Sequence, residues 1–509
     1  MKIKLKSTTL ITGKTRLAVA MLLPLVLTAC SSVSPIAYTK QEISERVDND
    51  LMSMYSDHEP VTAPLTFYDV AARALKYNLD YKLKLMEGAL SESLYQVSTF
   101  EMLPRLVAGA GYASRNNDSG GTSIGIDDGQ QSLRPSTSQE RDRTLGNLTF
   151  SWNALDFGVS YYRAQQKADQ VLMAEERRRK VVQNVLQDVR NSYWRAVGAQ
   201  RLIHRVDTLL ERAHKALAQA KDVEQQALKP KVEILAYQRA LLDAVSLLTL
   251  RRQDLELAKA ELNALMSVAP GQEYTLAEET ETQLFPVNGD ISQLEKLALE
   301  LRPELMEEWY RKRITENDIK AAKILLWPNI SLDTGLNYDS NKYSYNNSWS
   351  ESGVRISWNL LKLTQLPALR RAHDFQNQTD DMRRKALSMA VMTQVRVGTQ
   401  RYNLTLEELR FAEESMRVDQ SLLAYTKASA TSKFESELEL IRSEARALLA
   451  EYQRYVAYSN AQAAFGRVYN SIGLDVMPEN IESHDLSQLA ESIRVTLEQW
   501  QVVTLGPKA

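Results

Sequence analysis

The sequence predicts a mainly α-helical protein with a small β part, made of two internal repeats. The same order of segments occurs twice along its 509 residues: a helical run ending at a proline, two alternating stretches separated by a polar loop, and very long helical patterns. Asp80 precedes Pro104 by 24 residues, and Glu304 precedes Pro328 by the same distance. A repeat of this size indicates that one structural unit is used twice.

The N-terminus has the layout of a secretory signal. Its first 29 residues carry five basic and no acidic residues, and an apolar core covers 17–27. This core is too short for a membrane-spanning helix, which needs about 20 apolar residues. Residues 27–30, Leu-Thr-Ala-Cys, resemble a bacterial lipobox, in which the cysteine becomes the lipidated first residue of the mature chain. We therefore expect a covalent lipid on Cys30; an ordinary signal with a chance cysteine is the alternative.

Charge and cysteine content exclude several classes of function. Without the five basic residues of the signal, 57 of the 62 lysines and arginines remain against 64 acidic residues, a net charge of about −7. Nucleic acids select basic faces, so we expect no nucleic-acid partner. Cys30 is the single cysteine, which excludes a disulfide framework and a thiolate metal site.

Long helical patterns follow each pair of alternating stretches. Over about 159–226, apolar residues recur every three to four positions, and a second helix is expected over about 230–266, with Pro230 in its first turn. The same pair recurs at about 369–426 and 434–472. Short turns between long helices make antiparallel neighbours, so each half contains a long helical hairpin. The apolar stripes are too wide for a two-stranded seam and require contact with further helices.

Four alternating stretches carry the functional prediction. Each is about 9 to 11 residues long, the length of a tilted transmembrane β-strand, and aromatic residues lie near several ends. The stretch over 106–113 is the weakest, with small residues on both faces. The candidate lipid-facing residues are Phe150, Trp152, Ile356 and Trp358. A soluble hairpin half-buried on the helices is the alternative, because the alternation signal of barrel strands is weak in any one segment.

The loops and the export signal favour membrane-spanning strands. Residues 116–143 and 339–351 are polar and rich in glycine, serine, asparagine and aspartate, which suits an extracellular surface. A barrel in lipid must close, and single-chain barrels begin at about eight strands, so four strands cannot close alone. Two copies would give eight strands and three would give twelve, and a conduit favours three or more copies.

The order of these segments resembles the TolC family of outer-membrane export channels over about residues 66–473. Specific matches are Leu-Asp-Phe-Gly at 155–158, the pair Tyr193 and Trp194, and Arg-Pro-Glu-Leu at 302–305. The resemblance implies a homotrimer with one twelve-stranded barrel in the outer membrane and an α-barrel of long hairpins across the periplasm. It also implies a passive conduit that docks with a periplasmic adaptor (membrane fusion) protein and an inner-membrane transporter, for drug or ion efflux or for type I secretion.

The repeat and the resemblance together divide the chain into five segments. They are the lipoprotein signal peptide 1–29, the lipid-anchored extension 30–65, the first repeat 66–289, the second repeat 290–473 and a C-terminal periplasmic segment 474–509. The first repeat is expected to hold strands at about 105–114 and 145–153 and hairpin helices over about 158–266. The second is expected to hold strands at about 329–338 and 352–360 and hairpin helices over about 366–472.

The helix tips and one strand exit depart from the family pattern. Many efflux members carry a Val-Gly-x-Arg type of sequence at the tips, where the adaptor binds. Here the candidate adaptor-contact residues are Lys229, Pro230, Ser432 and Lys433, without that glycine or arginine. Residues 361–365 replace the usual aspartate or glycine turn, which predicts a changed strand-to-helix geometry.

The candidate periplasmic gate consists of Glu435, Glu439 and Arg442, just after the second tip. Glu439 and Arg442 are (i, i+3) neighbours that could exchange partners between chains. The alternative is a helix N-terminus that favours acidic residues through its dipole. Ser432 and Glu435 also have the spacing of a capping box.

No catalytic site is predicted. None of the five histidines is paired at metal-ligand spacing, and no nucleophile motif, phosphate loop or dinucleotide fingerprint is present. We expect no enzyme activity, no metal and no cofactor apart from the lipid on Cys30. The alternative to a channel is a lipid-anchored periplasmic helical scaffold or adaptor protein without a pore.

Overall fold

The structure, a computed structural model, divides the chain into two compact units, Met1–Glu59 and Pro60–Ala509. The described residues are 37–55, 58–122, 124, 127–132, 134–226, 230–269, 272–277, 284–287, 290–429, 434–475 and 485–505. The described part of the first unit contains helix α2 (Lys40–Tyr55), which has no buried residue. Thr39 and Glu42 cap it reciprocally, since each backbone N–H donates to the other side chain, at 2.7 and 3.3 Å.

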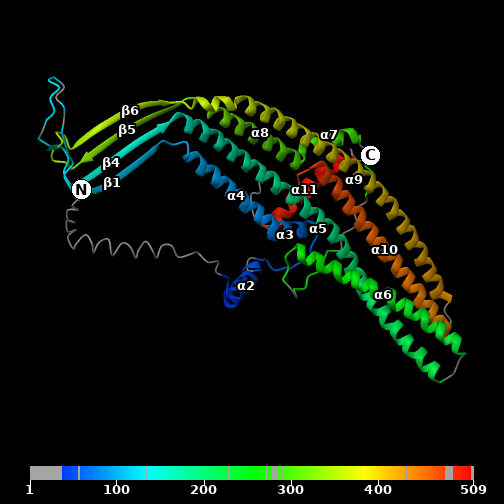
Figure 1. The fold of residues 1–509 in the computed structure, drawn as a ribbon. Coiled ribbons are helices and arrows are strands. Elements are labelled where there is room, and N and C mark those ends of the chain that lie inside the picture. Colours follow the sequence, from blue (N-terminus) through cyan, green and yellow to red (C-terminus); the bar gives the residue numbers. More distant parts are fainter. Residues whose placement is uncertain are drawn as a thin grey trace, which may run out of the picture. The chain divides into compact units, whose positions relative to one another are not determined.

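The second unit contains two sets of elements in the same order (Figure 1). The first set is α3 (Phe67–Tyr77), α4 (Leu79–Phe100), β1 (Arg105–Ser114), β4 (Asp142–Asn153), α5 (Ala154–Gln225) and α6 (Lys231–Leu265). The second set is α7 (Ile291–Leu301), α8 (Pro303–Ile324), β5 (Asn329–Asp339), β6 (Ser348–Ser357), α9 (Leu366–Ser429) and α10 (Phe434–Ile472). The remaining elements are the short strands β2 (Gly120–Gly121) and β3 (Ser136–Thr137), the 3-10 helix η1 (Leu360–Gln365) and the helix α11 (Leu486–Leu505).

Strands and helices of this unit continue one another in a single layer. Four strands form an antiparallel sheet in the order β1-β4-β5-β6. Helix α4 leads into β1 and α8 leads into β5, whereas α5 follows β4 and α9 follows β6 through η1. Helices α4 and α6 both pack on α5, and α8 and α10 lie between α5 and α9 (Figure 1). The helical layer therefore has the same lateral order as the sheet.

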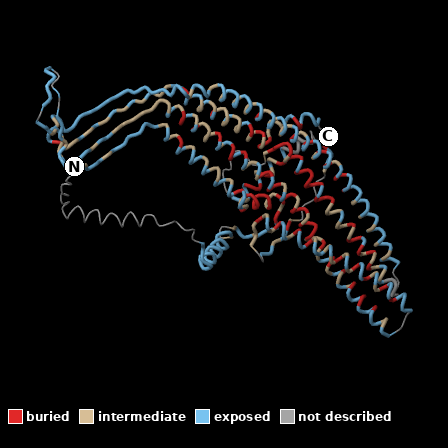
Figure 2. Tube along the Cα trace, in the orientation of Figure 1, coloured by how far each residue is buried: buried red, intermediate tan, exposed pale blue. Residues whose placement is uncertain are grey.

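Buried residues gather where α3, α5, α9, α10 and α11 meet, and they continue along the hairpin of α5 and α6 (Figure 2). We call the first cluster the central core. Its largest fully buried side chains include Tyr193, Tyr402 and Phe465. The rings of Tyr402 and Phe465 lie 5.2 Å apart, which joins α9 to α10. Apolar residues on the predicted 3.6-residue stripe of α5, such as Val189 and Val197, lie in this core.

The first strand-to-helix junction is tighter than predicted. Helix α5 begins at Ala154 rather than near residue 158, because Asn153 at the end of β4 caps it. The side-chain oxygen of Asn153 accepts hydrogen bonds from the backbone N–H groups of Leu155 and Asp156 at 3.0 and 3.1 Å. The strand therefore passes into the helix without a loop.

The prediction for the fourth strand, over about 352–360, was wrong in its bounds. The strand covers Ser348–Ser357, and Ser357 pairs with Asn329, the first residue of β5. Because Pro328 precedes Asn329 and has no N–H, the ladder ends there. Trp358 was predicted as a lipid-facing strand residue but lies beyond the strand, where its indole Nε1 donates to the carbonyl of Leu326 at 2.9 Å. The changed geometry expected at 361–365 is confirmed as η1.

Other corrections concern helix starts and helices that the sequence analysis missed. Pro230 was expected in the first turn of α6 but occupies its N-cap, with ψ of 130° outside the helical region. Helix α11 was not predicted within 474–509, although Leu489 and Ile493 pack into the central core. Helix α2 was likewise not predicted within 30–65.

Candidate functional site

The four-stranded sheet has one mainly apolar face and one mainly polar face, although Val107, Leu145 and Trp349 lie on the second. Leu106 lies opposite Phe150, and Ile330 lies opposite Ile356. We call this side the apolar sheet face; its main members are Leu106, Tyr112, Leu148, Phe150, Trp152, Ile330, Leu332, Leu336, Tyr338, Val354 and Ile356. Along β5 the apolar residues are exposed, whereas the polar residues between them are half-buried. This is the reverse of a soluble half-buried sheet, whose apolar face packs on a core.

Three of the four predicted lipid-facing residues lie on the apolar sheet face. Ile356 is 68% exposed, and Phe150 and Trp152 are half-buried. The ring of Trp152 lies 6.2 Å from that of Phe157 in the first turn of α5. The strand and the helix therefore share an aromatic contact at this end of the sheet.

The polar face of the sheet carries small residues opposite polar ones. A side chain added at Gly109 would bring its Cβ within 2.2 Å of Oδ1 of Asn147, the residue paired with it on β4. At Gly335 the corresponding distance to Oγ1 of Thr149 is 3.5 Å, an ordinary van der Waals contact. Glycine at position 109 therefore leaves room for the amide of Asn147 on the polar face.

The sheet has two open edges, on β1 and β6. Every neighbouring pair of strands is antiparallel, so these two edge strands run in opposite directions. The edge of β6 can therefore pair with β1 of another copy and continue the antiparallel order. An open edge is a template for such pairing.

The loops at the far end of the sheet are bonded to each other. Asn341 is 5% exposed and joins the two loops, because its side chain accepts from the N–H of Glu140 at 3.1 Å and donates to the carbonyl of Ser138 at 2.8 Å. Arg143 and Asp339 form an ion pair at 3.0 Å beneath it. The sequence analysis predicted polar loops but missed this bonding, since no local pattern marks a contact across about 200 residues.

Exposed apolar stripes follow both lateral edges of the helical layer. On α9 the stripe recurs at nearly every seventh residue: Phe375, Met382, Met389, Val397, Leu404, Phe411, Val418 and Tyr425. On the other edge it comprises Leu79, Leu83, Met86, Leu90 and Val97 of α4, and Leu235, Leu242, Leu250 and Leu257 of α6. A seven-residue apolar spacing is typical of a seam between packed helices.

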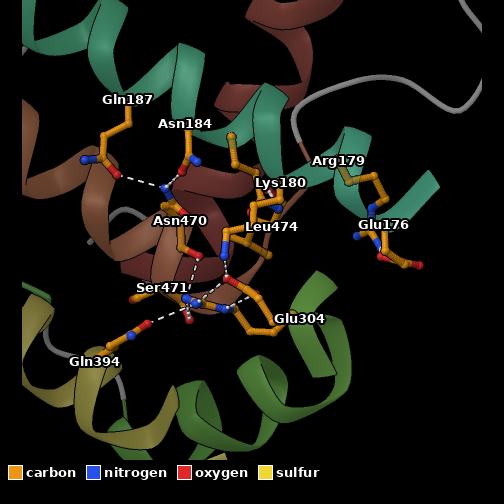
Figure 3. Close-up of polar contacts among 12 residues, drawn as sticks. Glu176, Arg179, Lys180, Asn184, Gln187, Glu304, Gln394, Asn470, Ser471 and Leu474 are labelled. Atoms are coloured by element: carbon orange, nitrogen blue, oxygen red, sulfur yellow. Dashed lines mark hydrogen bonds and ion pairs between the residues drawn. The ribbon is translucent and has the colours of Figure 1, made fainter. Parts of the chain in front are cut away.

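A buried arginine at the start of α8 joins this helix to α9 and α10 near the central core, and its partners Glu304, Gln394, Asn470 and Ser471 are labelled in Figure 3. Arg302 is 7% exposed and donates to both carboxylate oxygens of Glu304 at 2.9 Å. It also donates to the carbonyls of Asn470 and Ser471 at 3.2 Å and to the side chain of Gln394 at 2.9 Å. The two carbonyls belong to the last turn of α10, where a cation satisfies unpaired acceptors and favours the helix dipole.

Two glutamates of this region have pKa values shifted in opposite directions. Burial raises the pKa of Glu304, but the hydrogen bond from Lys180 and the charge of Arg302 outweigh it, so its pKa lies below the ordinary value of 4.5. For Glu176, burial dominates over the attraction of Arg179, and its pKa lies above 4.5. Both carboxylates lie within the group of polar contacts shown in Figure 3.

A second arginine is buried without a carboxylate beside it among the described ion pairs. Burial lowers the pKa of Arg190, whose guanidinium lies 4.8 Å from the ring centre of Phe67 and 5.8 Å from that of Phe465. Its Nη1 donates to Gln462 at 3.0 Å. The aromatic faces therefore supply the electrostatic partner of this cation.

Two features are absent from the described residues. Within them, no helix is both long and apolar enough to cross a membrane. The same part of the chain contains no group of three or more histidine, cysteine, aspartate or glutamate side chains arranged to hold a metal ion.

Solved structures with the same arrangement of strands and helices identify the fold. No protein-family model matches the sequence, and no curated protein does. Solved structures match over most of the chain. The outer-membrane channel OprN is 16% identical, with 80% of this chain and 89% of that chain covered and a TM-score of 0.59. This chain has the outer-membrane channel fold.

Two further structures support the assignment of this channel fold. The CmeC outer membrane channel of Campylobacter jejuni is 13% identical, with 91% of this chain and 97% of that chain covered and a TM-score of 0.62. The MtrE outer membrane channel of Neisseria gonorrhoeae is 14% identical, with 80% and 88% covered and a TM-score of 0.59. The resemblance to the TolC family that the sequence predicted is thus confirmed at the level of the fold.

The channel fold gives each quoted sequence motif a structural place. Residues 155–158 form the first turn of α5, and Tyr193 and Trp194 are buried in the central core. Residues 302–305 begin α8. The sequence analysis noted this last run but missed that Arg302 caps the end of α10. The only local sign of this role is an arginine directly before a Pro-Glu helix start.

The predicted gate and tip residues are only partly described. Nη1 of Arg442 and Oε2 of Glu439 lie 4.0 Å apart, and both side chains are exposed. Pro230 lies at the N-cap of α6. Cys30, Lys229, Ser432, Lys433 and the side chain of Glu435 lie outside the described residues.

Proposed function

We propose that this protein is a TolC-family outer-membrane channel of an export system. The observation that carries the proposal is the apolar sheet face, whose residues on β5 are exposed while the residues between them are half-buried. A bilayer is the environment that buries such a face, provided that the sheet closes and leaves no edge unpaired.

Closure requires several copies. Three copies of a four-stranded sheet give a twelve-stranded barrel, wide enough for a passage, if β6 of each copy pairs with β1 of the next. The same rotation brings the stripe on α9 against the stripes on α4 and α6 of the neighbouring copy. The open strand edges and the helix stripes are thus both covered by one head-to-tail contact between copies, and repetition of this contact closes a ring.

The remaining parts of the proposal follow from this assembly. The signal and the lipid on Cys30 bring the chain to the outer membrane, and the helical layer extends into the periplasm as an α-barrel. The tips, which include Pro230, dock with a periplasmic adaptor, and an inner-membrane transporter supplies the exported molecule. Glu439 and Arg442 would act at the periplasmic gate. The conduit is passive, and the transporter determines whether it serves efflux or type I secretion.

Paired arginine substitutions on one strand test the membrane assignment. Leu332→Arg places a charge on the apolar sheet face, whereas Ser331→Arg, the neighbouring residue, places it on the polar face. At the bilayer midplane, the first change costs about 2 to 4 kcal/mol. We expect Leu332→Arg to abolish a heat-modifiable trimer in detergent extracts of outer membranes and Ser331→Arg to leave it intact.

Replacement of the lipid-bearing residue separates the channel from the scaffold alternative. A Cys30→Ser chain should stay in the membrane fraction and require detergent for extraction, because its strands span the bilayer. A scaffold held by lipid alone would become soluble, and that result would contradict the channel proposal.

A further inference from the structure

A turn of exposed leucines follows the sheet at the second of its two strand-to-helix junctions. In η1, Leu360, Leu361 and Leu363 are 60%, 79% and 39% exposed. Residues three apart eclipse in a 3-10 helix, so Leu360 and Leu363 form one ridge and Leu361 lies on the next. Lys362 and Gln365 form the third ridge. The turn is therefore amphipathic, with two apolar ridges and one polar ridge.

The first junction shows that the fold does not need this turn. There β4 passes directly into α5, Asn153 caps the helix, and the first helical turn carries the acidic Asp156. At the second junction Asn359 makes no side-chain capping bond, and the chain inserts six residues before α9. The leucines are thus not explained by the geometry of joining a strand to a helix.

Other exposed apolar side chains lie at the same end of the sheet. Phe100 and Leu103, just before β1, are 68% and 60% exposed, and Trp327, just before β5, is 70% exposed. Trp358 is held at this end of the sheet by its hydrogen bond to the carbonyl of Leu326. Tryptophan rings with a fixed polar edge are typical of the boundary between hydrocarbon and headgroups. The apolar sheet face thus continues into η1 at one end of the strands.

Basic residues accompany the turn. Lys362 lies in η1, and Arg370 and Arg371 are exposed at the start of α9. We infer that η1 is an interfacial anchor whose leucines enter the acyl boundary of the inner leaflet. Lys362, Arg370 and Arg371 bind the headgroups of anionic phospholipids there. The inference rests on the proposed function, because it requires that the apolar sheet face spans the bilayer.

Depth-dependent quenching at single cysteines tests the anchor. The full chain carrying Cys30→Ser is given one new cysteine, Ile356→Cys on the apolar sheet face, Leu361→Cys in η1 or Lys385→Cys further along α9. Each variant is labelled with a nitrobenzoxadiazole fluorophore and reconstituted into vesicles of phosphatidylethanolamine and phosphatidylglycerol at 3:1. Phospholipids with a spin label high or deep in the acyl chain serve as quenchers.

The anchor predicts at least twofold quenching at position 361 by the shallow label, quenching at 356 by the deep label, and none at 385. Quenching at 356 without quenching at 361 would overturn the anchor and leave the channel standing. If the fluorophore at 361 were also blue-shifted, a neighbouring copy rather than lipid would cover the turn. Absence of quenching at both 356 and 361 would overturn the proposed function as well.

The charged part of the anchor has its own measurement. Lys362→Glu combined with Arg370→Glu and Arg371→Glu should lower the shallow quenching at position 361 about twofold in the anionic vesicles. Vesicles of phosphatidylcholine alone should show a smaller loss. An equal loss in both kinds of vesicle would overturn the assignment of anionic-headgroup binding to these residues.

Discussion

The central core and the helices next to the sheet are held together in different ways. We call the second region the upper layer; it comprises 154–180 of α5, 306–324 of α8 and 366–386 of α9. Neither apolar core cluster includes a residue of the upper layer. A few apolar side chains of α5, such as Val159 and Met173, are buried there, and ion pairs join neighbouring helices: Arg177 with Glu307, Lys312 with Asp381, and Arg313 with Asp169.

This difference indicates which apolar residues are buried within one chain and which remain exposed until other copies cover them. Packing in the central core is complete within the single chain, since Tyr193 and Tyr402 have no exposed surface. In the upper layer, Phe375 and Met382 are 66% and 65% exposed on the α9 stripe. The apolar stripe of the upper layer is therefore available for contacts between copies, and the ion pairs between its helices are sensitive to salt.

The largest effect is expected from a hole in the central core. Tyr402→Ala removes a fully buried ring and leaves the carbonyl of Phe285, which accepts from its hydroxyl at 2.9 Å, without that partner. Such a change costs about 4 kcal/mol of unfolding free energy. Guanidinium titration followed by circular dichroism measures it. Tyr345→Ala, at a fully exposed loop position, is the matched control and should change stability by less than about 0.5 kcal/mol.

Arg302→Ala should have the next largest effect. It leaves Glu304 and the carbonyls of Asn470 and Ser471 without their buried donor, which costs about 3 kcal/mol. The same titration with Arg417→Ala, which breaks an exposed pair with Glu414, should show less than about 1 kcal/mol. Equal losses in the two variants would contradict the role of Arg302 as a helix cap.

Periodic features of this fold could be read from the sequence, and contacts between distant segments could not. The long helices were predicted because a 3.6-residue stripe repeats over many turns, and α10 was predicted with both ends correct, at Phe434 and Ile472. The end of β6 was missed because it depends on where Pro328 stops the partner strand. Helix α11 was missed because its apolar residues are buried by packing on α3, a contact that the local sequence does not show.

The candidate site divides in the same way. Alternation on β4 and β6 predicted Phe150, Trp152 and Ile356 on one face, because side-chain direction in a strand is local. The bonding of Asn341 to the other loop and of Arg302 to α10 involves residues more than 160 positions apart. Neither has a local sequence pattern, so packing alone reveals them.

Salt should affect the upper layer more than the central core. Raising sodium chloride from 0.05 to 0.5 M screens its ion pairs, so amide hydrogen exchange in α8 should accelerate about threefold. Exchange in α10 near Phe465 should change by less than about 1.5-fold, because packing there does not depend on charge. Mass spectrometry of peptic fragments reports both regions in one experiment, and equal acceleration in both would remove the distinction between them.

The smallest effect is expected from Glu304 and Glu176, because each acts through the protonation of one group. The pKa of Glu304 is lowered in the folded state, so its contribution to stability is present above 4.5 and is lost as the pH falls through the folded pKa. The pKa of Glu176 is raised, so its contribution is present below 4.5 and is lost as the pH rises through the folded pKa. Between pH 3.5 and 7, the stability difference between wild type and Glu304→Gln should therefore grow with pH, whereas that for Glu176→Gln should fall. Thermal unfolding of the three proteins across this range measures both slopes, and slopes of the same sign would show that burial rather than the pairing with Lys180 and Arg302 governs Glu304.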